Sequence, residues 1–313
     1  MAATYQQGPS PREITAFNLF LEAAAGDVVD ALRRAGLRSV LFKGATTGRW
    51  LYETDPREYG DVDLLVNPAD FEDCERVLAG LGFERSPIER LFAVGRPSHA
   101  STWVRALMAV DLHRTLVGVG VGAEEAWSTL SASTETWTVG RSEVEILPAP
   151  ARCVVLALHA AQHGTAFGRT KDDLERAIAR VPTSTWVEAA NLARALEAET
   201  PMAAGLLSIS GGARLCGELG LRFVDAVPRE GSTSFHAAQG LLWLLAKRGA
   251  RAKAGYAWGK LFPPSSVMRS RVPWARSGRL ALAAAYAARL VRGLASAPRT
   301  VWVLTQLHRS RRR

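Results

Sequence analysis

Three aspartates in this sequence have the spacing of a metal site. Asp61 and Asp63 lie two residues apart within 59–66 (Tyr-Gly-Asp-Val-Asp-Leu-Leu-Val), and Asp111 follows within 108–113 (Met-Ala-Val-Asp-Leu-His). Side chains alternate along a β-strand, so Asp61 and Asp63 would share one face. Carboxylates this close repel each other unless a cation separates them, and such oxygen ligands suit Mg²⁺ or Mn²⁺. We predict metal binding by these aspartates, with Asp111 as the third acid that a two-metal site requires.

Phosphate-binding features accompany the aspartates, although a strand that begins with two solvated aspartates is an equally simple explanation of Asp-x-Asp alone. Lys43 and Gly44 lie between a predicted strand and a predicted helix. Glycine lets the backbone approach a ligand, and a helix N-terminus favours phosphate. Arg57, just ahead of the acidic pair, would neutralise a triphosphate. His113 shares a strand face with Asp111. It would either hold a metal ligand in place or pack as an ordinary core residue.

The elements that position these residues follow from apolar spacing and turn residues. The first half is predicted to contain a helix at 12–35 ending at Gly36, a strand at 39–42, a helix carrying 50–52, a strand at 62–66, and a helix from Asn67-Pro68 to about 78. The stretch 83–147 is predicted to be mainly β, with strands at 91–95, 101–113, 136–140 and 143–147. Helices are predicted at 150–163, 171–180, 184–198, 202–219 and 233–248. The predicted class is α+β.

The chain divides by texture into a mixed α/β domain at 1–148, a helical domain at 149–246 and a basic helical tail at 247–313. The tail holds 16 of the 39 Lys and Arg residues and no Asp or Glu, which leaves 23 basic against 30 acidic residues, a net −7, in the body. The tail's partner would be nucleic acid, an anionic membrane surface or an acidic protein. Otherwise the tail packs on the acidic body or is simply solvated.

Cysteine usage and hydropathy predict a cytoplasmic protein. The three cysteines, Cys74, Cys153 and Cys216, are far apart and form no CxxC pair, which is typical of reduced, buried thiols. The N-terminus lacks the features of a signal peptide, and no apolar run reaches the roughly 20 residues that a membrane-spanning helix needs.

Two further groups of polar residues admit competing interpretations. His159 and His163 are four apart on a predicted helix and so share a face, but Ala160 stands where a zinc protease would carry glutamate. A structural role is favoured over a role in lining the cleft. Asp172 and Asp173 would cap a helix, or else shape an acceptor site, and capping is favoured.

Together these motifs resemble one known family. The order of strand, glycine turn, helix, Asp-x-Asp strand and later aspartate resembles the polymerase-β type of nucleotidyltransferase fold. More narrowly, the segments 41–45, 51–52 with Arg57, 60–66, 110–113 and 158–163 resemble the family of uncharacterised nucleotidyltransferases. The broader superfamily usually has Gly-Ser or Gly-Gly at the turn, whereas Ala45 follows Gly44 here. Backbone amides, with Lys43, would then hold the phosphate.

The resemblance implies a mixed sheet followed by a helical domain, and metal-assisted transfer of a nucleotidyl group from a nucleoside triphosphate to a hydroxyl of a small-molecule or peptide acceptor. Asp61 and Asp63 would ligate the metal that carries the β- and γ-phosphates. Asp111 would hold a second metal or accept the acceptor's proton. Two alternatives stay open: a sugar-nucleotide-dependent glycosyltransferase that uses the same Asp-x-Asp site, and a non-catalytic regulator that binds nucleotide or nucleic acid.

Overall fold

The structure, a computed structural model, describes residues 9–86, 99–163, 168–221 and, further along, 258, 262, 265, 268–269 and 272–291. Within these residues, seven strands form one mixed sheet in the order β3-β4-β5-β2-β1-β7-β6. The strands are β1 (Ser39–Phe42), β2 (Val62–Val66), β3 (Glu84–Arg85), β4 (Ala100–Arg105), β5 (Met108–His113), β6 (Glu135–Val139) and β7 (Ser142–Ile146). The central strand β2 is parallel to β5 and antiparallel to β1. The predicted α+β class with a mixed sheet is confirmed.

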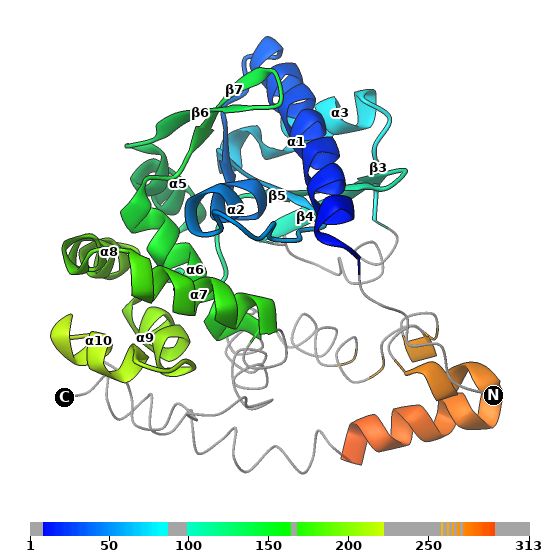
Figure 1. Ribbon diagram of the computed structural model, residues 1–313. Coiled ribbons are helices and arrows are strands. Elements are labelled where there is room, and N and C mark those ends of the chain that lie inside the picture. The colour runs from blue at the N-terminus through cyan, green and yellow to red at the C-terminus, as the bar shows by residue number, and fades with distance from the viewer. Residues whose placement is uncertain are drawn as a thin grey trace.

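Helices cover the sheet and continue the chain beyond it. They are α1 (Pro11–Arg34), α2 (Gly44–Leu51), η1 (Pro68–Asp70), α3 (Phe71–Gly80), α5 (Ala123–Ser131), α6 (Ala149–His163), α7 (Gly168–Arg180), α8 (Thr183–Ala195), α9 (Glu199–Leu207), α10 (Gly212–Glu218) and η3 (Pro273–Ser277). Figure 1 shows α1 in dark blue against the sheet, and α6 to α10 in green and yellow gathered on the other side of it.

Strand alternation sorts the residues of β2 onto two different faces. Leu64 belongs to a hydrophobic cluster with α1 and α3, whereas Leu65 belongs to a second cluster with α6 and the helices that follow it. Asp63 shares the face of Leu65, because residues two apart on a strand point the same way. The acidic face of the sheet is therefore the one that α6 and α7 cover.

Local sequence signals set several helix boundaries, and those at Gly36 and Asn67 were predicted. Ser10 and Glu13 form a reciprocal capping box at the start of α1. Gly36 follows the end of α1 at φ +76°, a conformation that glycine adopts without strain. The Asn67 side chain accepts a hydrogen bond from the Ala69 amide and so starts the short helix η1 that leads into α3. The cysteines are free and buried.

Two predictions of secondary structure were wrong, and one helix was missed. The single strand predicted at 101–113 is a hairpin of β4 and β5, with Ala106 at φ +51° in its turn. No glycine or asparagine marks this turn, so the sequence gives little sign of it. The stretch 83–147 also contains the helix α5. The single helix predicted at 202–219 is broken into α9 and α10, with Gly211 at φ +78°.

Other expectations lie beyond what the described residues test. The strand at 91–95 and the helix at 233–248 fall outside those residues, as does most of the basic tail. The division into domains also stays a prediction, although Val40, Phe42 and Leu65 of β1 and β2 belong to one hydrophobic cluster with residues of α6 to α10. In the described parts of the chain, no helix combines the length and apolarity needed to cross a bilayer.

Candidate active site

Two of the predicted aspartates lie side by side on neighbouring strands. Asp63 of β2 is in register with Asp111 of β5, and the strands are parallel, so both carboxylates project from the same face. Asp61 immediately precedes β2. All three aspartates line one cavity of about 880 Å³ between the sheet and α6–α7. This volume lies within the range of roughly 300–1,000 Å³ that is common for ligand pockets.

A histidine joins the aspartates where the sequence predicted only acids. Asp63, Asp111 and His113 have ligand atoms within 4.8 Å of one another, which makes them the candidate metal group among the described residues. The His113 Nε2 lies 2.9 Å from the Asp63 Oδ1. Asp61 is outside this group but lines the same cavity. The sequence analysis placed His113 at the edge of the site, and the structure places it at the centre.

Lys43 reaches the same carboxylate from the turn between β1 and α2. Its ammonium donates to the Asp63 Oδ1 at 2.6 Å. The backbone of Lys43 has φ +60° and that of Gly44 φ +41°. A side chain at Gly44 would crowd the carbonyl oxygen of Asp61 and the ring of Tyr59. The glycine therefore allows the turn to lie close to the segment that carries the acidic pair.

The charges of the site act on its carboxyl groups in opposite directions. Burial, with the charges of Asp63 and Asp111, raises the pKa of Asp61 to about 6. Burial and the charge of Asp63 also raise the pKa of Asp111. For Asp63, burial opposes ionisation, but the ammonium of Lys43 and the hydrogen bond with His113 hold its pKa well below its ordinary value. The positive charge of Lys43 therefore stabilises the ionised form of Asp63 more than that of Asp61 or Asp111.

The residues present fit a divalent cation. Asp111 Oδ1 and His113 Nδ1 are buried and have no hydrogen-bond partner among the described residues. A buried carboxylate oxygen without a partner is unfavourable unless something else pairs with it. The carboxylates of Asp63 and Asp111 are hard oxygen ligands, which suit Mg²⁺ or Mn²⁺, whereas the imidazole of His113 is a ligand more typical of Zn²⁺ or iron.

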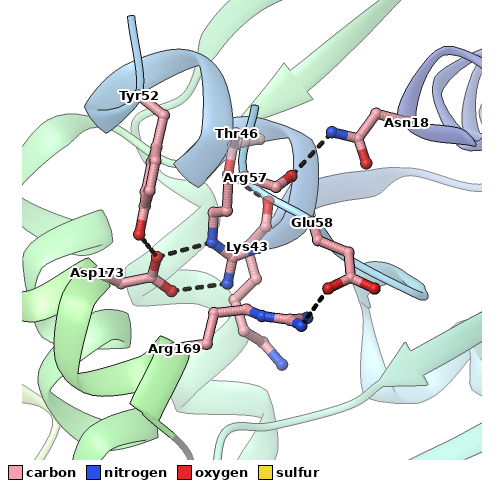
Figure 2. Close-up of polar contacts among 8 residues, drawn as sticks. All are labelled: Asn18, Lys43, Thr46, Tyr52, Arg57, Glu58, Arg169 and Asp173. Carbon is pink, nitrogen blue, oxygen red and sulfur yellow. Dashed lines mark hydrogen bonds and ion pairs between the residues drawn. The ribbon is translucent and has the colours of Figure 1, made fainter. Parts of the chain in front are cut away.

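Arg57 also lines the cavity, but its guanidinium is engaged by a partner that the sequence did not predict. Its Nε and Nη2 donate to the two carboxylate oxygens of Asp173 at 2.7 and 2.6 Å (Figure 2). The Tyr52 hydroxyl donates to the Asp173 Oδ1 at 2.7 Å. Burial lowers the pKa of Arg57, but the hydrogen bonds and charge of Asp173 outweigh it and raise that pKa overall.

This pairing corrects the favoured role of Asp173, and leaves that of Arg57 open. Asp173 lies within α7, which begins at Gly168, so it does not cap that helix. Asp172, its neighbour, lines the cavity. The predicted contact between Arg57 and phosphate stays a prediction.

The wall opposite the acids is formed mainly by α6 and by residues before α5. It includes the apolar Leu116, Val117, Val155 and Leu158, and the polar His159 and Gln162. His159 therefore faces the cavity, where the sequence analysis had favoured a structural role. The His163 side chain lies outside the described residues.

Sequence reasoning missed two residues near the acids. The Thr102 side chain, on β4, hydrogen-bonds to Asp111. His99, at the start of the same hairpin arm, lies 6.1 Å from His113 between ring centroids, and burial lowers its pKa to about 4. No sequence signal pointed to Thr102, because the antiparallel hairpin that places it opposite Asp111 was not predicted.

Comparison with known families now decides the class of the protein. The pattern that defines the uncharacterised nucleotidyltransferases matches residues 10–210, well over half of the chain. The chain belongs to this family. The match spans the strands that carry the aspartates and the helices that face them, and it confirms the prediction of a nucleotidyl-transfer enzyme.

Solved structures similar to this nucleotidyltransferase are distant. One is the antibiotic-resistance factor ANT(2'')-Ia in solution, at 12% identity and a TM-score of 0.38, covering 57% of this chain and 92% of that one. The same factor in a crystal with adenylyl-2''-tobramycin gives 13%, 0.42, 55% and 97%. An antigenic nucleotidyltransferase-like protein from Paracoccidioides brasiliensis gives 16%, 0.34, 57% and 92%. At such TM-scores these likenesses support no conclusion about the acceptor. A search of curated proteins finds no match.

Proposed function

We propose that this nucleotidyltransferase moves a nucleotidyl group from a nucleoside triphosphate to a hydroxyl of a small-molecule or peptide acceptor, and that the reaction depends on a divalent metal. One observation carries the proposal. Asp63 and Asp111 stand in register on parallel strands, at the floor of a cavity that Asp61 and the Lys43-Gly44 turn also line.

The acids and the turn divide the work at the floor of the cavity. Asp63, Asp111 and His113 would hold Mg²⁺ or Mn²⁺, and Asp61 would contribute a further carboxylate. A metal bound there would neutralise the charge of the phosphates and stabilise the transition state of nucleotidyl transfer. Lys43 lies on the same carboxylate, close enough for its ammonium to turn to a phosphate once a metal takes its place on Asp63. The amides at the start of α2 would add donors to that phosphate.

The far wall suits the parts of the substrates that carry no charge. Leu116, Val155 and Leu158 offer an apolar surface to a base or to the body of the acceptor. Asp111, whose Oδ1 has no partner among the described residues, lies at the floor facing this wall. As the alternative to holding a metal, Asp111 would accept the proton of an acceptor hydroxyl while that hydroxyl attacks the α-phosphorus and pyrophosphate leaves.

A donor screen with the full chain tests the proposal. Each nucleoside triphosphate and each common sugar nucleotide is incubated with Mg²⁺ or Mn²⁺ and a pool of hydroxyl compounds and peptides. Pyrophosphate release that EDTA abolishes, and that excess Mg²⁺ or Mn²⁺ restores, is the expected result. Release of a nucleoside diphosphate from a sugar nucleotide would instead favour the glycosyltransferase alternative. Binding of nucleotide without either product would favour the non-catalytic regulator.

The basic tail does not enter this proposal. Its 16 Lys and Arg residues are a property of the sequence, and most of them lie outside the described residues. Binding of the tail to nucleic acid, an anionic membrane or an acidic partner stays a prediction. A cytoplasmic location likewise stays a prediction.

A further inference from the structure

A second ionic centre lies beside the acids, where α7 meets the loop that leads into β2. Arg57 belongs to that loop and Asp173 to α7, and their side chains are only 8% and 1% exposed. Both oxygens of Asp173 are used, since Oδ1 accepts from Arg57 Nε and from the Tyr52 hydroxyl, and Oδ2 accepts from Arg57 Nη2 (Figure 2). A two-pronged guanidinium–carboxylate contact fixes direction as well as distance.

The same loop is held at its backbone. The Asn18 side-chain amide, from α1, donates to the carbonyl oxygen of Arg57 at 2.8 Å. Next in the chain, Glu58 accepts from Arg169 of α7 at 2.6 Å (Figure 2). Arg57 is therefore held from both sides, by its side chain from α7 and by its carbonyl from α1.

The held residue is close in sequence to the acids. Three residues separate Arg57 from Asp61, and one of them, Tyr59, packs against Gly44 of the turn that carries Lys43. The Tyr59 hydroxyl also donates to Glu22 of α1 at 3.2 Å. A shift at Arg57 would thus move both the segment 59–61 and the turn against which this segment rests.

We propose that Arg57 and Asp173 are positioning residues, through which α7 fixes the loop that delivers Asp61 and Asp63 to the cavity. The consequence for catalysis rests on the proposed function, whereas the positioning itself does not. A phosphate contact would compete with this role, because turning the Arg57 guanidinium to a phosphate would leave Asp173 buried with only Tyr52. Buried charges that lose their partner are strongly unfavourable.

The test compares the buried pair with an exposed pair between the same two elements. Arg180 of α7 contacts Glu53 of the loop at 3.2 Å, with side chains 40% and 77% exposed. The variants are Asp173→Asn, Arg57→Lys, their double variant, and Arg180→Ala as the matched control. Each full-length protein is followed by hydrogen–deuterium exchange of peptides covering 53–66, and by titration with Mn²⁺ alone, using the electron paramagnetic resonance of free Mn²⁺.

The expected result is faster exchange at 53–66 in Asp173→Asn and Arg57→Lys, with Mn²⁺ binding weakened about 10–100-fold, as is usual when a residue that orients a metal ligand is changed. Exchange and Mn²⁺ affinity in the double variant should equal those of the more strongly affected single variant, because both residues act through one contact. Arg180→Ala should match the wild type in both measurements.

Wild-type exchange and wild-type Mn²⁺ affinity in Asp173→Asn would overturn the proposal and return Arg57 to the role of a phosphate ligand. Should the single variants unfold, Arg57→Met with Asp173→Leu replaces the pair by apolar side chains of similar size, which is often tolerated. It should still lose protection at 53–66, and wild-type protection there would equally overturn the proposal. If the wild type binds no Mn²⁺, the metal dependence under the proposed function fails, while the exchange comparison still decides the positioning.

Discussion

Two of the ion pairs of this molecule, Lys43–Asp63 and Arg57–Asp173, are built differently. Lys43 touches Asp63 through a single contact, and its side chain remains 19% exposed to the cavity. Arg57 grips Asp173 through two contacts, and both side chains are nearly inaccessible. Both carboxylate oxygens of Asp173 already accept hydrogen bonds. Asp111, which lies beside Asp63, keeps a buried oxygen without a partner among the described residues.

The difference indicates that a bound metal ion can replace Lys43 as the partner of Asp63, whereas nothing can replace Arg57 as the partner of Asp173. The flexible and partly exposed ammonium of Lys43 can give way to a metal ion on the buried Asp63 carboxylate, since the ion replaces one positive charge by another. A buried two-pronged contact has no such substitute, because breaking it strands a charge away from water. We therefore expect the Lys43 pair to govern chemistry and the Arg57 pair to govern shape.

The largest effect is expected at the exchangeable pair. Asp63→Asn should lower the rate of pyrophosphate release by about a thousandfold or more, because a metal contributes several kcal/mol of transition-state stabilisation and each 1.36 kcal/mol is tenfold. Circular dichroism should show a folded protein. Retention of the wild-type rate in a folded variant would remove Asp63 from the metal site.

Breaking the buried pair of Arg57 and Asp173 should lower the stability of the protein. Asp173→Ala leaves the Arg57 guanidinium buried without its carboxylate and should lower the free energy of unfolding by about 3–5 kcal/mol. Urea denaturation followed by tryptophan fluorescence measures this loss. A change below about 1 kcal/mol would show that water or another group reaches Arg57 easily, and the contrast between the pairs would disappear.

Lys43→Met sharpens the comparison through metal rescue. Among the described residues, the variant leaves Asp63 with the hydrogen bond to His113 alone, and it should lower the free energy of unfolding by about 1–3 kcal/mol. Added Mn²⁺ should raise the melting temperature of this variant more than that of the wild type, because no ammonium competes for Asp63. Differential scanning fluorimetry measures both shifts. Equal shifts would mean that Lys43 and the metal do not share Asp63.

The smallest effect is expected at the exposed pair. Arg180→Ala removes the contact with Glu53, and exposed ion pairs contribute little. The free energy of unfolding should change by less than about 0.5 kcal/mol in the same urea assay. A loss comparable to that of Asp173→Ala would show that any tie between the loop and α7 matters, buried or not.

Much of the local structure could be predicted from the sequence. The strands at 39–42 and 62–66, the end of α1 at Gly36 and the start of η1 at Asn67 follow from apolar runs and capping residues, which act over a few residues. The turn at Ala106 could not be found in this way, because alanine is not a residue type that marks a turn. The break before α10 does carry a local signal, the pair Gly211-Gly212, which the prediction of a single helix at 202–219 did not use.

The sequence by itself determined the acids, the lysine–glycine turn and the family they belong to, because Asp-x-Asp on a strand and the turn before it are close in the chain. Only the tertiary structure decided which of these residues are in contact. The register of β2 on β5 brings Asp111 and His113 beside Asp63, and α7, more than a hundred residues after the loop, brings Asp173 to Arg57. Such contacts depend on how distant elements pack, and spacing along the chain does not encode them directly.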